Sequence, residues 1–134
     1  VCFVGDGGYQ MTGNEISVAV ERKLPIRFIV SNNSSLGTIR LYQEKTYPDR
    51  TLATNMTNPD FAKIAEAYGA KGFKIETNED IAPVIKEAFA VDGPSLIEVK
   101  ASLEYLAAYI NMSQIKAAKK QKQEDQFLGP VGED

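Results

Sequence analysis

Four short apolar segments alternate along the chain with segments of helical periodicity. The apolar segments lie at 1–4, 26–33, 71–77 and 95–100. Strands that are buried on both faces have such continuous apolar sequences, and they are typical of parallel sheets. Strands separated by helices predict right-handed crossovers between neighbouring parallel strands. We therefore predict an α/β fold, in which a parallel sheet carries helices on both faces.

Apolar residues spaced three and four apart predict the helices between these strands. The helical segments are expected to begin after residue 12 and to include 38–47, 59–68, 79–91 and 103–118. Thr12 and Glu15 have the T-x-x-E spacing of a capping box, which gives Glu15 a structural role. Asn58 is the predicted N-cap of the third helix, with Pro59 in its first turn.

Two regions are expected from this pattern. Residues 1–102 would form the α/β domain, and residues 103–134 a C-terminal helix with a flexible tail. The tail comprises the polar sequences "KKQKQEDQ" and "GPVGED", which are typical of solvated or disordered segments. The sequence has no initiator Met and opens inside a strand-like segment, so we expect that it is part of a longer protein.

Composition excludes several classes of function. The net charge of −3 gives no electrostatic support for binding nucleic acid, and no apolar stretch is long enough to suggest a membrane span. The absence of histidine removes the usual general base. Cys2 is the single cysteine and cannot form an internal disulfide, which favours a reducing, cytoplasmic location.

Two polar stretches, Gly5–Gly8 and Asn32–Ser35, follow the first two predicted strands. Ligands of open parallel sheets bind beyond the carboxyl ends of the strands. If the strands are neighbours, Asp6 and Asn33 converge there and offer the oxygen ligands that suit Mg²⁺ or Ca²⁺. The glycines beside Asp6 would let backbone N–H groups reach phosphate oxygens. We therefore expect a cation that bridges Asp6 and a phosphate group.

These two stretches also have simpler interpretations than a binding site. Each stretch alone is a common turn, and only the pair at two strand ends is specific. A dinucleotide-binding fingerprint is disfavoured because Gln10 occupies the position of its third glycine, and Asn32-Asn33 replaces the acidic residue for ribose. A P-loop is excluded because no Gly-Lys-Ser/Thr follows.

The combination of Gly-Asp-Gly, a helix, a strand and Asn-Asn resembles the signature of thiamine-diphosphate-dependent enzymes. Segments 5–44, 61–75 and 93–99 are similar to the branch of acetolactate synthase and benzoylformate decarboxylase. The resemblance covers roughly residues 1–100. It implies the thiamine diphosphate-binding fold, and more narrowly the diphosphate-binding domain, which is the last of three domains in that family.

The resemblance also implies roles for individual residues. The implied cofactor-binding residues are Gly5, Asp6, Gly7, Gly8, Asn33, Leu36 and Gly37. The implied Mg²⁺ ligands are the side chains of Asp6 and Asn33 and the backbone carbonyl of Ser35. The implied substrate-side residues are Thr38, Ile39 and Tyr42. Gln10 and Met11 either line the cofactor pocket or pack at the helix entry. Surface roles are expected for Arg40, Lys45 and Arg50, although one of them could meet a substrate carboxylate.

The implied activity is decarboxylation of a small 2-oxo acid, with the thiazolium ring as electron sink, followed by carboligation to a second 2-oxo acid. Pyruvate decarboxylases carry a glutamate at the position of Ile39, so the aliphatic residue favours the acetolactate synthase pattern. Two alternatives stay open, a decarboxylase of the benzoylformate type and a non-catalytic regulatory or scaffold domain.

The resemblance places the activating glutamate on a pyrimidine-binding domain, usually that of a partner subunit. No catalytic residue is therefore expected in this chain, which alone would be inactive. A homodimer or homotetramer is implied, whereas the sequence leaves open both FAD dependence and whether the chain is a fragment or a separate subunit.

Overall fold

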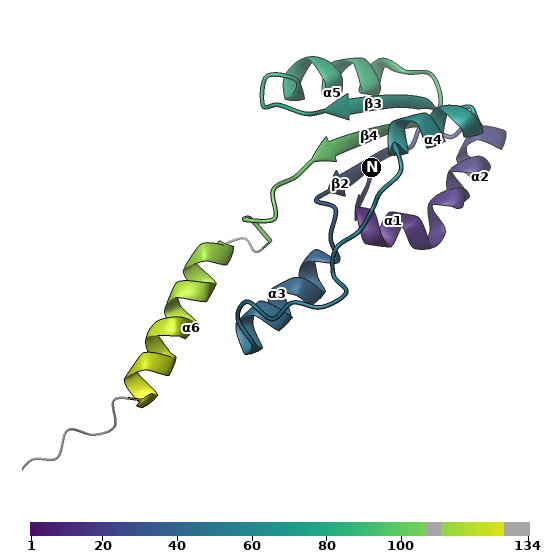
Figure 1. The fold of residues 1–134 in the computed structure, drawn as a ribbon. Coiled ribbons are helices and arrows are strands. Elements are labelled where there is room, and N and C mark those ends of the chain that lie inside the picture. The colour runs from purple at the N-terminus through teal and green to yellow at the C-terminus, as the bar shows by residue number, and fades with distance from the viewer. Residues whose placement is uncertain (107–110, 128–134) are drawn as a thin grey trace, which may run out of the picture. The chain divides into compact units, whose positions relative to one another are not determined.

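The computed structural model describes residues 1–106 and 111–127, with side chains up to residue 121. Two compact units are present (Figure 1). Unit 1 comprises Val1–Ser35 and Met56–Ala101, and unit 2 comprises Leu36–Asn55 and the described residues from Ser102 onward. Within the described ranges, no helix combines the length and the apolar character needed to cross a bilayer.

Unit 1 is built on a four-stranded parallel sheet. Its strands are β1 (Cys2–Gly5), β2 (Arg27–Asn32), β3 (Lys71–Ile75) and β4 (Ser95–Lys100). Their order across the sheet is β1-β2-β4-β3, and every neighbouring pair is parallel. Gly5 pairs with Ser31, and Asn32 pairs with Lys100. The carboxyl ends of β1 and β2 therefore lie side by side at one end of the sheet, as predicted, and that of β4 lies beside them. We call this end the carboxyl edge of the sheet.

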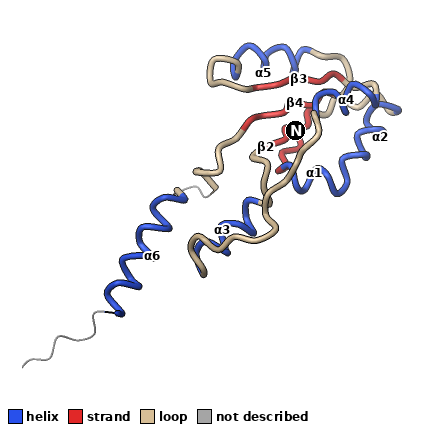
Figure 2. The backbone as a smooth tube through the Cα atoms, viewed as in Figure 1, coloured by secondary structure: helices blue, strands red, loops and turns tan. Residues whose placement is uncertain are grey.

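Helices cover both faces of this sheet (Figure 2). The helices of unit 1 are α1 (Asp6–Thr12), the 3₁₀ turn η1 (Gly13–Glu15), α2 (Ile16–Glu21), α4 (Phe61–Tyr68) and α5 (Ile81–Ala90). Val30 and Leu96 pack with Tyr9 and Phe61 from α1 and α4. Adjacent residues of β4 and β2, such as Ile97, face the opposite side and pack with α5. The α/β prediction is confirmed, because alternate strand residues supply both cores.

The first helix begins earlier than the sequence pattern predicts. α1 starts at Asp6, directly after β1, and Thr12 makes no side-chain capping hydrogen bond. The predicted capping box of Thr12 and Glu15 is therefore wrong. Gly5 adopts the extended conformation of an N-cap residue (φ −76°, ψ 160°), which allows the helix to begin at once.

The predicted start of α4 is wrong as well. Asp60, not Asn58, is the N-cap, and its side chain accepts a hydrogen bond from the Lys63 N–H at 3.0 Å. Gly69 ends the helix as predicted, in the left-handed conformation (φ 94°) that glycine adopts without strain.

Unit 2 contains α3 (Gly37–Thr46), close to the predicted segment, and α6 (Met112–Phe127). The predicted helix from Leu103 to Ala118 is wrong at both ends, and α6 includes the sequence "KKQKQEDQ" assigned to the tail. α6 begins where it does because Asn111 and Gln114 form a reciprocal capping box, at 3.0 and 2.9 Å. Residues 107–110 and "GPVGED" lie outside the described residues. The domain boundary at residue 102 stays a prediction.

Candidate functional site

The Gly-Asp-Gly-Gly sequence joins β1 to α1 at the carboxyl edge of the sheet. Asp6, Gly7 and Gly8 form the first turn of α1, where backbone N–H groups have no backbone acceptor within the helix. A Cβ atom at Gly8 would lie 3.0 Å from Val4 Cγ2, so glycine permits close packing on β1. A Cβ atom at Gly5 would meet nothing within 4 Å. Open space therefore lies beside the end of the strand.

Asp6 is a buried carboxylate, with 2% of its surface exposed. Its Oδ1 accepts a hydrogen bond from the Gly7 N–H at 2.9 Å, and its Oδ2 accepts one from Asn58 Nδ2 at 2.7 Å. None of the ion pairs among the described residues involves Asp6. A buried carboxylate without a basic partner is costly, and each oxygen keeps capacity for a further contact. These properties fit a ligand of a hard cation such as Mg²⁺.

The turn after β2 is organised by two asparagines. Asn32 Oδ1 accepts from the Ser34 N–H at 3.1 Å, and Asn33 Oδ1 accepts from the Ser35 N–H at 3.0 Å. Ser34 has a left-handed backbone (φ 53°), which is uncommon for a residue with a side chain and concentrates at functional sites. Its carbonyl accepts from the Met56 N–H at 2.8 Å. The turn therefore has a defined conformation at the same sheet edge as Asp6.

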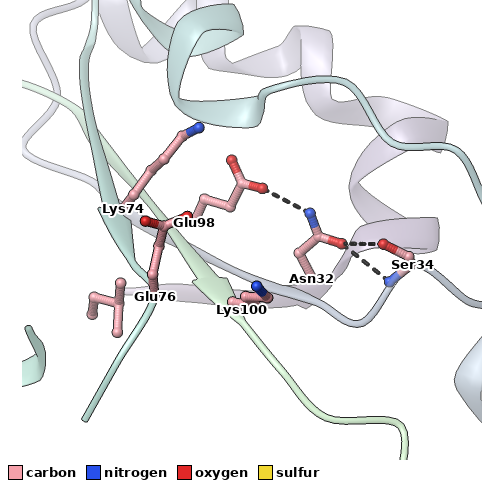
Figure 3. Close-up of a pocket in the computed structure, with 7 residues that line it drawn as sticks. Asn32, Ser34, Lys74, Glu76, Glu98 and Lys100 are labelled. Carbon is pink, nitrogen blue, oxygen red and sulfur yellow. Dashed lines mark hydrogen bonds between the residues drawn. The ribbon is translucent and has the colours of Figure 1, made fainter.

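A chain of hydrogen bonds joins the two predicted strand ends to the start of α4. Asn58 Nδ2 donates to Asp6 Oδ2 and, at 2.8 Å, to Asn32 Oδ1. Asn32 Nδ2 donates to Glu98 Oε1 at 2.7 Å, and Glu98 Oε2 accepts from the Phe61 N–H at 3.1 Å. Figure 3 shows the Asn32 carboxamide between Glu98 and Ser34. The hydrogen-bonded side chains thus follow one another in the order Asp6, Asn58, Asn32 and Glu98, with a carboxylate at each end.

Sequence reasoning missed Asn58 and Glu98 as members of the site. Asn58 precedes Pro59, and this pair has the pattern of a helix start, which gives the asparagine an ordinary explanation. Glu98 lies in an apolar strand, and a single acidic residue there carries no distinctive signal. An acidic residue in a largely buried strand needs a partner, but the sequence does not show which residue that partner is.

A polar pocket of about 190 Å³ lies beside this chain of hydrogen bonds. It is lined by Asn32, Ser34, Lys74, Ile75, Glu76, Glu98 and Lys100 (Figure 3). Lys74 Nζ donates to Asp60 Oδ2 at 2.8 Å, and this hydrogen bond, with that from the Lys63 N–H, lowers the pKa of the Asp60 carboxyl. The predicted ligands Asp6 and Asn33 do not line the pocket.

The described residues contain no cluster of three histidine, cysteine, aspartate or glutamate side chains that could hold a metal. A cation at the edge of β1 and β2 would therefore depend on mixed ligands, namely one carboxylate, an amide oxygen and backbone carbonyls. The assignment of Asp6, Asn33 and Ser35 as ligands stays a prediction that fits this donor set.

The predicted substrate-side residues belong to unit 2. Leu36 is the N-cap of α3, Gly37 and Thr38 open the helix, and Ile39 and Tyr42 follow in it. Ile39 and Tyr42 are 51% and 64% exposed. They line an open, largely apolar pocket of about 330 Å³ together with Gln43, Thr46 and Tyr47.

The basic residues of unit 2 have local partners. The Lys45 ammonium lies 5.8 Å from the centroid of the Tyr42 ring, and the Arg50 guanidinium lies 5.7 Å from that of Tyr47. Arg40 Nη1 donates to the Asn55 side chain at 2.8 Å. These contacts fit the surface roles expected for the three residues.

Comparison with known proteins gives a consistent match. Residues 1–99 match the family model described as "Thiamine pyrophosphate enzyme, C-terminal TPP binding domain". The catalytic subunit of mitochondrial acetolactate synthase from Saccharomyces cerevisiae is 36% identical over 96 residues, which cover 72% of this chain and 14% of that protein. The acetolactate synthase large subunit of Haemophilus influenzae is 40% identical over 92 residues, covering 68% and 16%. The putative thiamine pyrophosphate-containing protein YdaP of Bacillus subtilis is 36% identical over 99 residues, covering 74% and 17%. The chain therefore spans about a sixth of the length of these relatives.

Proposed function

Because the chain belongs to the thiamine pyrophosphate enzymes and matches their C-terminal TPP-binding domain, we propose that unit 1 holds the diphosphate of thiamine diphosphate through Mg²⁺. Asp6 and Asn33 would supply side-chain oxygens, and Ser35 a backbone carbonyl. The observation that carries this proposal is the buried Asp6 carboxylate, which has no ion pair among the described residues. A cation there would neutralise Asp6 and attract a phosphate group.

The first turn of α1 would complete the contact with the diphosphate. The N–H groups of Gly7 and Gly8 lie in that turn, where backbone donors favour an anion; the Gly7 N–H, which donates to Asp6 Oδ1 at 2.9 Å, would be shared between Asp6 and the diphosphate. Gly5, Leu36 and Gly37 would border the cofactor. We assign no proton transfer to a side chain of this chain, because the activating glutamate would come from a pyrimidine-binding domain.

For the whole protein we propose an activity of the acetolactate synthase type. When bound, thiamine diphosphate supplies a thiazolium ring that serves as an electron sink for decarboxylation of a 2-oxo acid. The names of the relatives from Saccharomyces cerevisiae and Haemophilus influenzae support this activity. The aliphatic Ile39, exposed on α3, supports carboligation of small 2-oxo acids. Thr38, Ile39 and Tyr42 would face the substrate.

We further propose that the active protein is a homodimer or homotetramer, in which a partner subunit supplies the pyrimidine-binding domain. The chain alone would then bind the cofactor poorly and be inactive. A cytoplasmic location is proposed from the free thiol of Cys2, which is exposed. The relative from Saccharomyces cerevisiae is mitochondrial by name, so fractionation of the native cells is the test of location.

The test of cofactor binding uses Asp6→Ala in the protein encoded by the complete open reading frame. Calorimetric titration with thiamine diphosphate in the presence of Mg²⁺ should show no binding. Without the Asp6 carboxylate the site no longer holds Mg²⁺, which is the positive charge that binds the diphosphate. Asp92→Ala, which removes an exposed carboxylate from a turn of unit 1, is the matched control and should bind like the wild type. Wild-type affinity in Asp6→Ala would show that the proposed cation site is wrong.

Product analysis with pyruvate tests the activity separately. The unaltered protein should release CO₂ and form 2-acetolactate as the main product. Acetaldehyde as the main product would instead assign the protein to the decarboxylases. Failure of both reactions with intact cofactor binding would favour a regulatory or scaffold role.

A further inference from the structure

We propose that Asn58 is a positioning residue for the cation site, which orients the Asp6 carboxylate through a direct hydrogen bond. This inference rests on the proposed function of Asp6 as a ligand of Mg²⁺. Asn58 lies 52 residues after Asp6, in the segment that leads into α4, and its Nδ2 is 2.7 Å from Asp6 Oδ2. It does not need to touch the cation or the cofactor for this role.

Three hydrogen bonds fix the orientation of the Asn58 carboxamide. Its two N–H donors are used by Asp6 Oδ2 at 2.7 Å and Asn32 Oδ1 at 2.8 Å. Its oxygen accepts from Gln10 Nε2 at 2.6 Å. The side chain therefore links α1, through Asp6 and Gln10, to the end of β2 at Asn32.

The direction of these hydrogen bonds follows from chemistry. Ionised carboxylates only accept hydrogen bonds, so the group of Asn58 that faces Asp6 must be its NH₂. In the same way, the group of Asn32 that faces Glu98 must be its NH₂. The Asn32 oxygen then points toward Asn58, where it accepts the second N–H. Carboxylates at both ends leave one consistent arrangement of the two amides.

This arrangement sets which lone pairs of Asp6 remain available. Oδ2 is engaged by Asn58, and Oδ1 by the Gly7 N–H at 2.9 Å. Two hydrogen bonds, one on each oxygen, restrain rotation of the carboxylate and leave its remaining lone pairs in fixed directions. Partners that orient a metal ligand in this way typically contribute about 10- to 100-fold in metal affinity.

The test is a titration with Mn²⁺ as a spectroscopic probe, in the presence of thiamine diphosphate. Wild type, Asn58→Ala, Asn58→Gln and Asn78→Ala are compared in the protein encoded by the complete open reading frame. Asn78 is exposed in a turn of unit 1, and it gives the matched control. The measured quantities are the dissociation constant of Mn²⁺ from electron paramagnetic resonance and the Mg²⁺ concentration for half-maximal turnover.

We expect Asn58→Ala to raise both quantities about 10- to 100-fold, with a smaller rise for Asn58→Gln, which retains the carboxamide on a longer side chain. Turnover at saturating Mg²⁺ should recover to within about threefold of the wild type, because the reacting groups are untouched. A structural defect would not be reversed by Mg²⁺ in this way. Asn78→Ala should match the wild type.

The outcomes separate this inference from the proposed function. If the wild type shows no Mn²⁺ binding that depends on thiamine diphosphate, the proposed function fails and this inference fails with it. If the wild type binds Mn²⁺ and both Asn58 variants bind it equally well, the positioning role alone is overturned. A loss of turnover in Asn58→Ala that saturating Mg²⁺ does not restore also overturns it.

Discussion

Replacement of Glu98 by glutamine should destabilise unit 1, because two donors depend on its carboxylate. Glu98 Oε1 accepts from Asn32 Nδ2 at 2.7 Å, and Oε2 accepts from the Phe61 N–H at 3.1 Å. The second contact satisfies the first N–H of α4, which has no acceptor within its own helix. Glutamine offers a single acceptor oxygen, so one of the two donors must face an NH₂ group.

The cost can be worked out for either orientation of the new side chain. If its oxygen serves Phe61, its NH₂ faces the NH₂ of Asn32, and reversal of Asn32 would place two donors of Asn32 and Asn58 against each other. If its oxygen serves Asn32, the first N–H of α4 is left without an acceptor. One lost hydrogen bond to a charged group costs about 1.5–3 kcal/mol, and the lost negative charge at the helix start about 0.5 kcal/mol. Because both contacts are only partly buried, we expect about 2 kcal/mol in total.

Urea unfolding of the 134-residue chain, followed by circular dichroism, measures this free energy. Glu76→Gln is the matched control, because Glu76 lines the same polar pocket as Glu98 but is exposed. Exposed substitutions of this kind stay within about 0.5 kcal/mol of the wild type. If Glu98→Gln were no less stable than Glu76→Gln, the hydrogen bonds of Glu98 to Asn32 and Phe61 would contribute nothing to the stability of the fold. The argument from the donor and acceptor directions of these hydrogen bonds would then be refuted.

Three further substitutions test other contacts by the same unfolding assay. Gly72→Ala should destabilise by about 1–3 kcal/mol, since the new Cβ would approach the Ala62 carbonyl oxygen; unchanged stability would contradict this close packing. Tyr9→Phe should raise stability by about 1 kcal/mol at pH 7, because the Tyr9 hydroxyl is buried and has no partner among the described residues. Burial raises the pKa of Tyr9, so the unfolded chain ionises this tyrosine first, and the wild type should lose stability relative to Tyr9→Phe as the pH rises above about 10; parallel pH profiles of the two proteins would contradict it. Asp60→Asn keeps the cap of α4 but removes the ion pair with Lys74, so it should be less stable than the wild type. The difference in the free energy of unfolding should shrink as the pH falls below about 4, because the lowered pKa of Asp60 confers stability only above that range. A difference that stays constant with pH would exclude the ion pair as its cause.

The sheet could be predicted from the sequence because its signal is local. Each parallel strand is buried on both faces, so its apolar residues are contiguous, and all four predicted strands are present within a few residues of their expected bounds. The helix starts were harder to predict, since several neighbouring residues can act as caps. Thr12 and Asn58 are suitable N-cap residues by type, yet the structure uses Gly5 and Asp60.

The candidate site could be predicted only in part, for a different reason. Asp6 and Asn33 occur in stretches whose composition and spacing are unusual, so the sequence points to them directly. Asn58 reaches Asp6 across 52 residues, and Glu98 reaches Asn32 across 66. Such pairs depend on strand order and on the path of the connecting segment, which no local pattern encodes.

The wrong prediction for Asn58 and its inferred role have one physical cause. An N-cap residue accepts a backbone N–H through its side-chain oxygen, whereas the oxygen of Asn58 accepts from Gln10 Nε2 at 2.6 Å and its two N–H donors bind Asp6 and Asn32. A cap contributes about 1 kcal/mol to a helix, and Asp60, two residues later, supplies it through its own carboxylate. The helix therefore loses nothing when Asn58 turns toward the sheet edge. An asparagine that is free of its expected local task, and engaged instead by a buried carboxylate, is placed where it can orient a ligand of the cation.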